Sequence, residues 1–246
     1  MKKTRCFTCG GDYDPNYIDK PCPECGRTYG KVNLEEKKND KEFMDKVQGL
    51  NIPDSYIGSK WTKDILQKEK SQEASNRNFI RFADQLEKVV RLFEVGRIPA
   101  KSALVIAPSG YSKITWAYTC MQLAVENGYS VAPILDTIEL KRLLILASDN
   151  PRYKLYGTID YDKYIMSDVC FVTVTKTEYC LDAWRTILEI IDRRSRKGLA
   201  TFIISRFDIE TISKRDYDGH FKSFTDYNGN QNSLKYPVII QYESGF

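Results

Sequence analysis

Two pairs of cysteines dominate the first 26 residues of the chain. Cys6 and Cys9 form one Cys-x2-Cys unit, and Cys22 and Cys25 form a second unit after twelve intervening residues. Four thiolates in two such pairs supply the tetrahedral coordination that Zn²⁺ takes in structural sites. A glycine follows each unit, which lets the backbone turn tightly enough for its amides to approach the sulfurs. The sequence therefore predicts a zinc ribbon over residues 1–30.

Protein ligands fill all four positions of this predicted zinc ion, so we expect the metal to be structural and not catalytic. The alternative is four unrelated buried cysteines, but burial alone does not explain two CxxCG units so close together. The other cysteines, Cys120, Cys170 and Cys180, fall in helix or strand patterns and are expected in the core. His220 is the only histidine, so mechanisms that need two imidazoles are excluded.

The composition is typical of a cytoplasmic protein with two unequal parts. Its 246 residues allow one good-sized core plus a small module. No apolar run approaches the roughly 20 residues that span a bilayer, and no apolar stretch follows the basic N-terminus, so we expect no membrane segment. The formal net charge of +4 permits contact with nucleic acid without demanding it.

A charged segment follows the cysteines. The run EEKKNDKEFMDK is typical of a solvated helix, and residues 31–62 are therefore expected to form a charged helical linker. Pro53 and Gly58 make the end of this segment irregular. The aromatic residues Tyr56 and Trp61 are expected to anchor it to the larger domain.

Residues 63–246 carry the pattern of an α/β domain. Short apolar, β-prone runs alternate with amphipathic helical segments, as in a parallel sheet covered by helices. The expected strands are residues 103–107, 130–135, 169–175, 201–205 and 238–242. The expected helices are residues 113–127, 137–147 and 178–197, preceded by a helix whose apolar face runs from Phe79 to Phe93.

The turn after the first expected strand has the context of a phosphate-binding loop. The strand is followed by PSGYSKIT and then by a helical run. In Walker A proteins, a loop at this place binds phosphate through its amides and the helix N-terminus. Against GxxxxGK[ST], Ala107 and Ser112 replace the two glycines, and Ile114 replaces the hydroxyl residue that holds Mg²⁺. Lys113 alone remains of the four diagnostic positions.

Two residues of this loop offer partial compensation, because Gly110 allows a tight turn and Thr115 offers a hydroxyl one position late. A Walker B strand ends in an acid that holds Mg²⁺, but the matching strand ends in Thr173 and Val174. We therefore expect negligible hydrolysis of ATP, and even binding of ATP or ADP is doubtful. The alternative is an ordinary α/β domain that never bound nucleotide.

The order of these segments resembles the AAA+ ATPases of the bacterial replicative helicase-loader type, the DnaC and DnaI proteins, and their relatives the transposition ATP-binding proteins. The resemblance covers roughly residues 50–208 and runs through NIPDSY, APSGYSKITWAY, NGYSVAPILDTIELKRLL, SDVCFVTVTKTE, WRTILEIIDRRSRKGL and TFIISRFDIETI. It implies a P-loop fold of the AAA+ kind, in which Ser205 matches the polar sensor 1 position. A zinc-binding N-terminal domain is similar to that of the DnaI branch, which implies that it contacts the helicase.

Two departures limit what this resemblance implies: the changed Walker residues, and the region after Asp208, which lacks the arginine-finger helix of the family. The leading hypothesis is a DNA-replication adaptor, a pseudo-ATPase that binds a replicative helicase and single-stranded DNA, as suits a bacteriophage or mobile element. One alternative is a divergent active ATPase of the loader or clamp-loader kind, with Thr115 and Asp168 holding Mg²⁺. Another is a zinc-containing regulatory protein that uses the α/β body as a scaffold.

Basic residues gather at the end of the expected helix 178–197. Arg193, Arg194, Arg196 and Lys197 are candidates for contact with nucleic acid. The alternative is a solvated helix end, where cations are favourable. Aromatic residues such as Tyr242 offer rings that stack on bases, but core packing and an edge strand are the preferred interpretation.

The cysteine pattern predicts one tightly bound zinc ion per chain. Replacing Cys22 by Ser should release the metal and unfold mainly the N-terminal module, because three thiolates no longer complete the tetrahedron. Elemental analysis of both purified proteins measures the zinc content. Freshly purified wild-type protein without zinc would contradict the prediction.

Overall fold

The structure, a computed structural model, describes residues 4–5, 12–13, 34–99, 102–150, 152, 154–155, 159–174, 183–207 and 238–242. Two short strands, β1 (Thr4–Arg5) and β2 (Asp12–Tyr13), pair antiparallel near the N-terminus. The predicted zinc ligands lie outside the described residues; they are Cys6, Cys9, Cys22 and Cys25. The zinc ribbon therefore stays a prediction.

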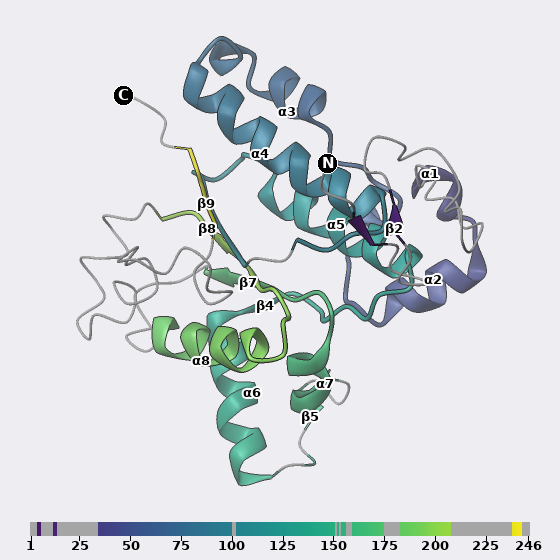
Figure 1. The fold of residues 1–246 in the computed structure, drawn as a ribbon, viewed down its shortest axis with the longest axis vertical. Helices are drawn as coiled ribbons and strands as arrows, with labels where there is room; N and C mark the ends of the chain where they lie inside the picture. Colours follow the sequence, from purple (N-terminus) through teal and green to yellow (C-terminus); the bar gives the residue numbers. More distant parts are fainter. Residues whose placement is uncertain are drawn as a thin grey trace.

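A parallel sheet of five strands forms the centre of the described chain (Figure 1). Its strands are β3 (Ala103–Ile106), β4 (Leu135–Asp136), β7 (Phe171–Val174), β8 (Phe202–Ser205) and β9 (Val238–Gln241). They lie in the order β4-β7-β8-β3-β9, and every neighbouring pair is parallel. The predicted α/β fold is confirmed, and β9 is an edge strand as expected.

Helices cover both faces of this sheet (Figure 1). On one face lie α4 (Arg77–Glu94) and α5 (Lys113–Glu126), and on the other lie α6 (Thr137–Asp149), α7 (Tyr161–Met166) and α8 (Ala183–Ser195). Alternate strand residues enter the two cores, so Val105 and Phe202 pack on the side of α4 while Leu104 and Ile203 pack on the side of α6. This alternation follows from the pleat of a strand. It gives each layer of helices an apolar surface, as a buried parallel sheet requires.

Local signals in the sequence set the ends of these helices. The side chain of Asn76 caps α4, and Asp136 takes part in a capping box that begins α6. Gly128 follows the C-cap of α5 with a φ of 83°, a conformation that glycine adopts without strain. The expected strand over residues 130–135 is wrong in most of its length, because only β4 and one isolated bridge pair there.

Residues 34–62, expected to form a charged helical linker, pack on the core of the α/β domain. They contain α1 (Leu34–Lys37), α2 (Lys41–Gln48) and the 3₁₀ turn η1 (Asp54–Tyr56). Phe43, Val47 and Trp61 are at most 2% exposed and join the same apolar core as α4 and α5. Apolar residues at i and i+4 give α2 one buried face. The charged run therefore contains a helix that packs on the core, and the expected anchoring role of Trp61 is confirmed.

Backbone hydrogen bonds join this segment to α5. The N–H of Gly58 donates to Gln122 Oε1 over 2.7 Å, and the N–H of Trp61 donates to Thr119 Oγ1 over 2.8 Å. Gly58 has a φ of 77°, and a Cβ there would lie 3.1 Å from the side chain of Lys38. A residue larger than glycine would therefore strain both the backbone and the packing.

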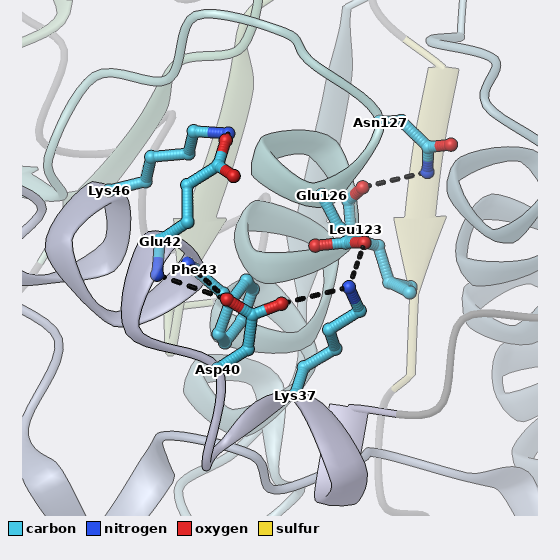
Figure 2. A network of polar contacts seen from close by, with 8 residues as sticks. All are labelled: Lys37, Asp40, Glu42, Phe43, Lys46, Leu123, Glu126 and Asn127. Carbon is cyan, nitrogen blue, oxygen red and sulfur yellow. Dashed lines mark hydrogen bonds and ion pairs between the residues drawn. The ribbon is translucent and has the colours of Figure 1, made fainter.

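Lys37 ties α1, α2 and α5 together (Figure 2). Its ammonium lies 3.2 Å from Asp40 Oδ2 and 2.7 Å from Glu126 Oε1. Asp40 caps α2 by accepting from the N–H groups of Glu42 and Phe43. The Phe43 and Lys37 hydrogen bonds lower the pKa of Asp40, and the Glu126 hydrogen bond raises the pKa of Lys37.

Short elements complete the described fold. The helix α3 (Lys63–Glu69) and the 3₁₀ turn η2 (Ser71–Glu73) precede α4, and β5 (Lys154–Leu155) pairs antiparallel with β6 (Ile159–Asp160) before α7. Among the described residues, no helix combines the length and the apolar character needed to cross a membrane.

Replacing Phe43 by Ala should lower the free energy of unfolding by about 3–5 kcal/mol, because a buried ring is replaced by a cavity. Urea unfolding measures the change. Gln48→Ala, at an exposed position of the same helix, is the matched control and should change stability by less than about 0.5 kcal/mol. Small and equal changes in stability for both substitutions would instead support a solvated helix that does not pack on the core.

Candidate functional site

The loop of residues 107–112 leads from the carboxyl end of β3 to the first residue of α5. It lies at the edge where the parallel strands end. The strand register places Ile106 beside Ser205, and Ser205 beside Val174. The predicted positions Lys113, Thr173 and Ser205 therefore share this edge of the sheet.

Lys113 binds the backbone of its own loop. Its Nζ donates to the carbonyl oxygens of Ala107 and Pro108, each over 2.6 Å, and the residue is only 7% exposed. Burial lowers the pKa of the ammonium to about 8, because the charged form loses water. The lysine that remains of the Walker pattern is thus engaged by two carbonyl groups.

Two residues of the loop have left-handed backbones. Gly110 has a φ of 83° and Ser112 has a φ of 48°. Glycine takes such an angle without strain, whereas a residue with a Cβ pays about 1–2 kcal/mol. Ser112 therefore adopts a backbone conformation that suits glycine, the residue found at this position of the Walker A pattern. Its hydroxyl offsets part of this strain by donating to Glu69 Oε2 over 2.7 Å.

Two carboxylates from the region before α4 contact the loop, and we call Glu69 and Glu73 the acid cap. Glu69 ends α3 and accepts the serine hydrogen bond just described. Glu73 ends η2 and accepts from Tyr111 Oη over 2.5 Å and from the hydroxyl of Tyr242. Lys70, between the two acids, lies 4.6 Å from the centre of the Tyr111 ring.

The hydrogen bonds of the acid cap determine its charge. Burial raises the pKa of Glu73, but the hydrogen bonds from Tyr111 and Tyr242 and the charge of Lys70 lower it, and the pKa lies below the ordinary value. Burial and the bond to Glu73 raise the pKa of Tyr111 above its usual range and that of Tyr242 to about 12. At neutral pH Glu73 is therefore anionic and both tyrosines remain donors.

The loop combines groups that favour a bound anion with groups that oppose one. The first amides of α5 are free to bind an anion, as at any helix start, and Ser112 provides no side-chain cap. The acid cap sets two carboxylates against the loop that leads to these amides, and the ammonium of Lys70 lies against the same loop. The ammonium of Lys113 already has two carbonyl partners.

The other two predicted nucleotide positions at this edge, Thr173 and Ser205, offer hydroxyl groups and no carboxylate. Thr173 is 7% exposed at the end of β7 and offers no carboxylate. Ser205 uses its hydroxyl within its own turn, accepting from the N–H of Phe207 over 3.0 Å and donating to the Phe207 carbonyl over 3.1 Å. The sensor-like position is therefore satisfied internally.

Asp168 and Thr115 lie at opposite ends of the strands. Thr115 is half-buried in the first turn of α5, near the carboxyl edge of the sheet. Asp168 precedes β7 and accepts from the N–H and hydroxyl of Ser130, over 2.8 and 2.7 Å, at the amino edge. These two residues therefore cannot share a Mg²⁺ ion, which corrects the alternative that joined them.

Arg194 is buried, which corrects its prediction as a nucleic-acid contact. It is 0% exposed, and its guanidinium donates to the carbonyl oxygens of Ile165, Ser167 and Ala200 over 2.9, 2.7 and 2.7 Å. Its Nε also donates to Thr201 Oγ1 over 3.0 Å. The planar fork of five donors lets one side chain satisfy several acceptors. Arg194 thus ties the end of α7 and the start of β8 to α8.

The exposed arginines beside it are paired on the surface of α8. Arg193 lies 2.7 Å from Glu189, and Arg196 lies 2.5 Å from Asp192, each one helical turn away. Lys197 is exposed at the end of the same helix. Most of the predicted basic cluster therefore resembles the solvated helix end that was its alternative.

Sequence reasoning misses the acid cap. Glu69 and Glu73 stand in an ordinary charged stretch, and Glu73 meets Tyr242 across 169 positions of the chain. No local sequence motif predicts such a contact. The one available signal is Ser112, whose hydroxyl at a glycine position needs a partner. Tyr242 itself is 2% exposed, so its expected core packing is confirmed.

The described cysteines are core residues. Cys120 and Cys170 are buried and free, as predicted, and burial raises the pKa of both thiols. Within the ranges that the structure describes, no three His, Cys, Asp or Glu side chains gather in a way that could hold a metal ion. Cys180 lies outside those ranges.

Comparison with known proteins gives similarity to solved structures alone. No known protein family matches the chain, and none of the curated proteins does. A DnaC helicase loader is similar at 16% identity, over 65% of this chain and 90% of that chain, with a TM-score of 0.45. A DnaI structure is 17% identical, over 74% of this chain and 93% of that chain, with a TM-score of 0.42. The replication initiator DnaA bound to AMPPCP and single-stranded DNA is 12% identical, over 68% of this chain and 46% of that chain, also with a TM-score of 0.42. Such values describe a distant likeness of folds.

The buried ammonium of Lys113 makes stability depend on pH. Its folded pKa of about 8 lies below the ordinary value of 10.5, so between these values the unfolded chain binds more protons and stability rises with pH. Relative to Lys113→Met, the free energy of unfolding of the wild type should increase from about pH 8 to about pH 10, by at most about 1.4 kcal/mol per pH unit. Urea unfolding of both proteins measures this difference. A flat difference would show that the ammonium is solvated, and a falling one that its folded pKa is raised and not lowered.

Proposed function

We propose that this chain is a DNA-replication adaptor of the helicase-loader kind, which binds a replicative helicase without hydrolysing ATP. The observation that best supports this proposal is the loop of residues 107–112, where the hydroxyls of Tyr111 and Ser112 donate to the acid cap. The sheet retains the strand, loop and helix of a P-loop scaffold. Of the diagnostic Walker A side chains only Lys113 remains, and its ammonium donates to two carbonyl oxygens.

The chemistry of phosphoryl transfer explains why hydrolysis is not expected. The γ-phosphate must be neutralised by Mg²⁺ and a water must be oriented for attack. Ile114 cannot ligate Mg²⁺, and Thr173 and Val174 cannot replace two carboxylates. Such electrostatic groups supply most of the rate of this reaction, so their joint loss costs several orders of magnitude.

The partners are proposed from the resemblance of the sequence to helicase loaders. We assign contact with the helicase to the predicted zinc ribbon of residues 1–30, as in the DnaI branch that the sequence resembles. Single-stranded DNA is the second proposed ligand, and the net charge of +4 is compatible with it. Binding of partners, and not turnover, is then the role of the molecule.

The full chain should capture a purified bacterial replicative helicase equally well with and without ATP. It should release no phosphate above background when Mg²⁺, helicase and single-stranded DNA are all present, because no described group holds the metal at the loop. Affinity capture and a steady-state phosphate assay measure the two results. Lys113→Ala is the control and should change neither.

Two outcomes would replace the proposal. Turnover near about 1 per second, abolished by Lys113→Ala, would establish the divergent ATPase, since this is an ordinary enzyme rate. Failure to capture any replicative helicase, with another protein captured instead, would favour the zinc-containing regulator.

A further inference from the structure

The helix α4 carries an uncompensated positive charge. Each of its acids is neutralised by a nearby cation: Asp84 by Lys63 at 2.5 Å, Glu87 by Arg91 at 3.1 Å and Glu94 by Lys60 at 2.5 Å. The helix has three further cations, Arg77, Arg81 and Lys88, which are exposed. Among the described residues, none of these three has an ion-pair partner.

These three cations share one stripe of the helix, which we call the α4 stripe. Positions i, i+4 and i+11 point within about 40° of one another on a helix of 3.6 residues per turn. The rise per residue separates the first from the last by about 16 Å. A nucleic-acid strand carries a phosphate about every 3.4 Å along a stacked helix. The α4 stripe is therefore long enough to follow about five phosphates.

The predicted cluster on α8 offers much less free charge. Arg193 and Arg196 each have an acid one turn away, Arg194 is buried, and only Lys197 is exposed without such a pair. A pair of opposite charges attracts a polyanion weakly, because the two fields largely cancel beyond a few ångströms. The cations of α4 are therefore a stronger candidate for contact with nucleic acid than those of α8.

The surface chemistry of the stripe favours a nucleic-acid backbone over an acidic protein. A protein interface usually has an apolar centre inside its polar rim. The large apolar side chains exposed among the described residues are Ile65, Ile138, Ile145 and Met166, and none of them lies on α4. Contact through cations alone suits phosphates, which need no apolar partner.

We infer that the α4 stripe binds the sugar-phosphate backbone of single-stranded DNA without reading its sequence. The inference rests on the proposed function only in taking single-stranded DNA as a ligand. Asp84 lies on the same line of the helix between Arg81 and Lys88 and is paired with Lys63. The exposed residues between the cations include Asn78 but no aromatic ring on which a base could stack. Affinity should therefore fall steeply with salt and differ little between base compositions.

The test measures binding of labelled oligothymidylate and oligodeoxyadenylate to the full chain by fluorescence anisotropy. Arg77→Gln, Arg81→Gln and Lys88→Gln are combined in one variant, and the matched control combines Arg193→Gln, Arg196→Gln and Lys197→Gln, which removes the same charge from α8. Three phosphate contacts on a single strand predict a slope of about −2 in log affinity against log salt. The α4 variant should lose this slope and roughly 20-fold in affinity at low salt, while the α8 variant stays within about 2-fold.

A conservative variant keeps the test independent of folding. Arg77→Lys, Arg81→Lys and Lys88→Arg together preserve the charge, and they should bind DNA within about 3-fold of the wild type because a phosphate contact needs charge more than shape. Equal loss in the α4 and α8 variants, or loss in the α8 variant alone, would overturn the inference. Loss of DNA binding in the conservative variant as well would overturn it too.

The helicase assay separates this inference from the proposed function. A wild type that captures helicase but binds no DNA overturns the α4 stripe and leaves helicase binding in place. DNA binding that depends on the α4 stripe, without helicase capture, supports the stripe and removes the adaptor role. An α4 variant that loses helicase but keeps DNA identifies the stripe as a protein-binding face and overturns the inference.

Discussion

The need to cover both faces of a parallel sheet governs this molecule. The central strands are buried on each side, and their alternate side chains supply two apolar surfaces. One surface receives α6, α7 and α8, whereas α4 and α5 alone leave the other core incomplete. Residues 34–62 complete it, with Phe43 and Trp61 inside. The burial of these rings explains how a highly charged segment packs on the core.

Burial also decides which charged residues can act. Arg194 stands among surface cations in the sequence, yet its guanidinium donates to buried backbone carbonyls. Without it these carbonyls would lie unpaired in the interior. Lys113 is engaged in the same way by two carbonyls. The two basic residues that sequence patterns single out most readily are therefore structural. Arg77, Arg81 and Lys88 of α4, which are exposed and have no ion-pair partner among the described residues, belong to no recognised motif.

The sequence predicts the fold well because apolar period and turn chemistry are local. The strand at residues 103–107, the helix that follows it and the long apolar face from Phe79 to Phe93 all match the structure closely. The expected strand at residues 130–135 does not match the structure, because an apolar segment can pack beside a sheet without forming ladder hydrogen bonds along its whole length. The candidate site is less predictable. Its loop is visible as a damaged Walker pattern, but the contact between Glu73 and Tyr242 depends on the whole topology.

The place of β3 in the sheet affects how the chain folds during synthesis. β3 is an interior strand, and its neighbours β8 and β9 are made much later, as the hydrogen bond between Ser102 and Thr201 across 99 positions illustrates. At about 5–20 residues per second, the ribosome supplies β8 only after roughly 5 to 20 seconds. Until then both edges of β3 are unpaired and apolar, a state that invites association between nascent chains. The α4–α5 layer, complete earlier, is the available cover for one face of β3 during that interval.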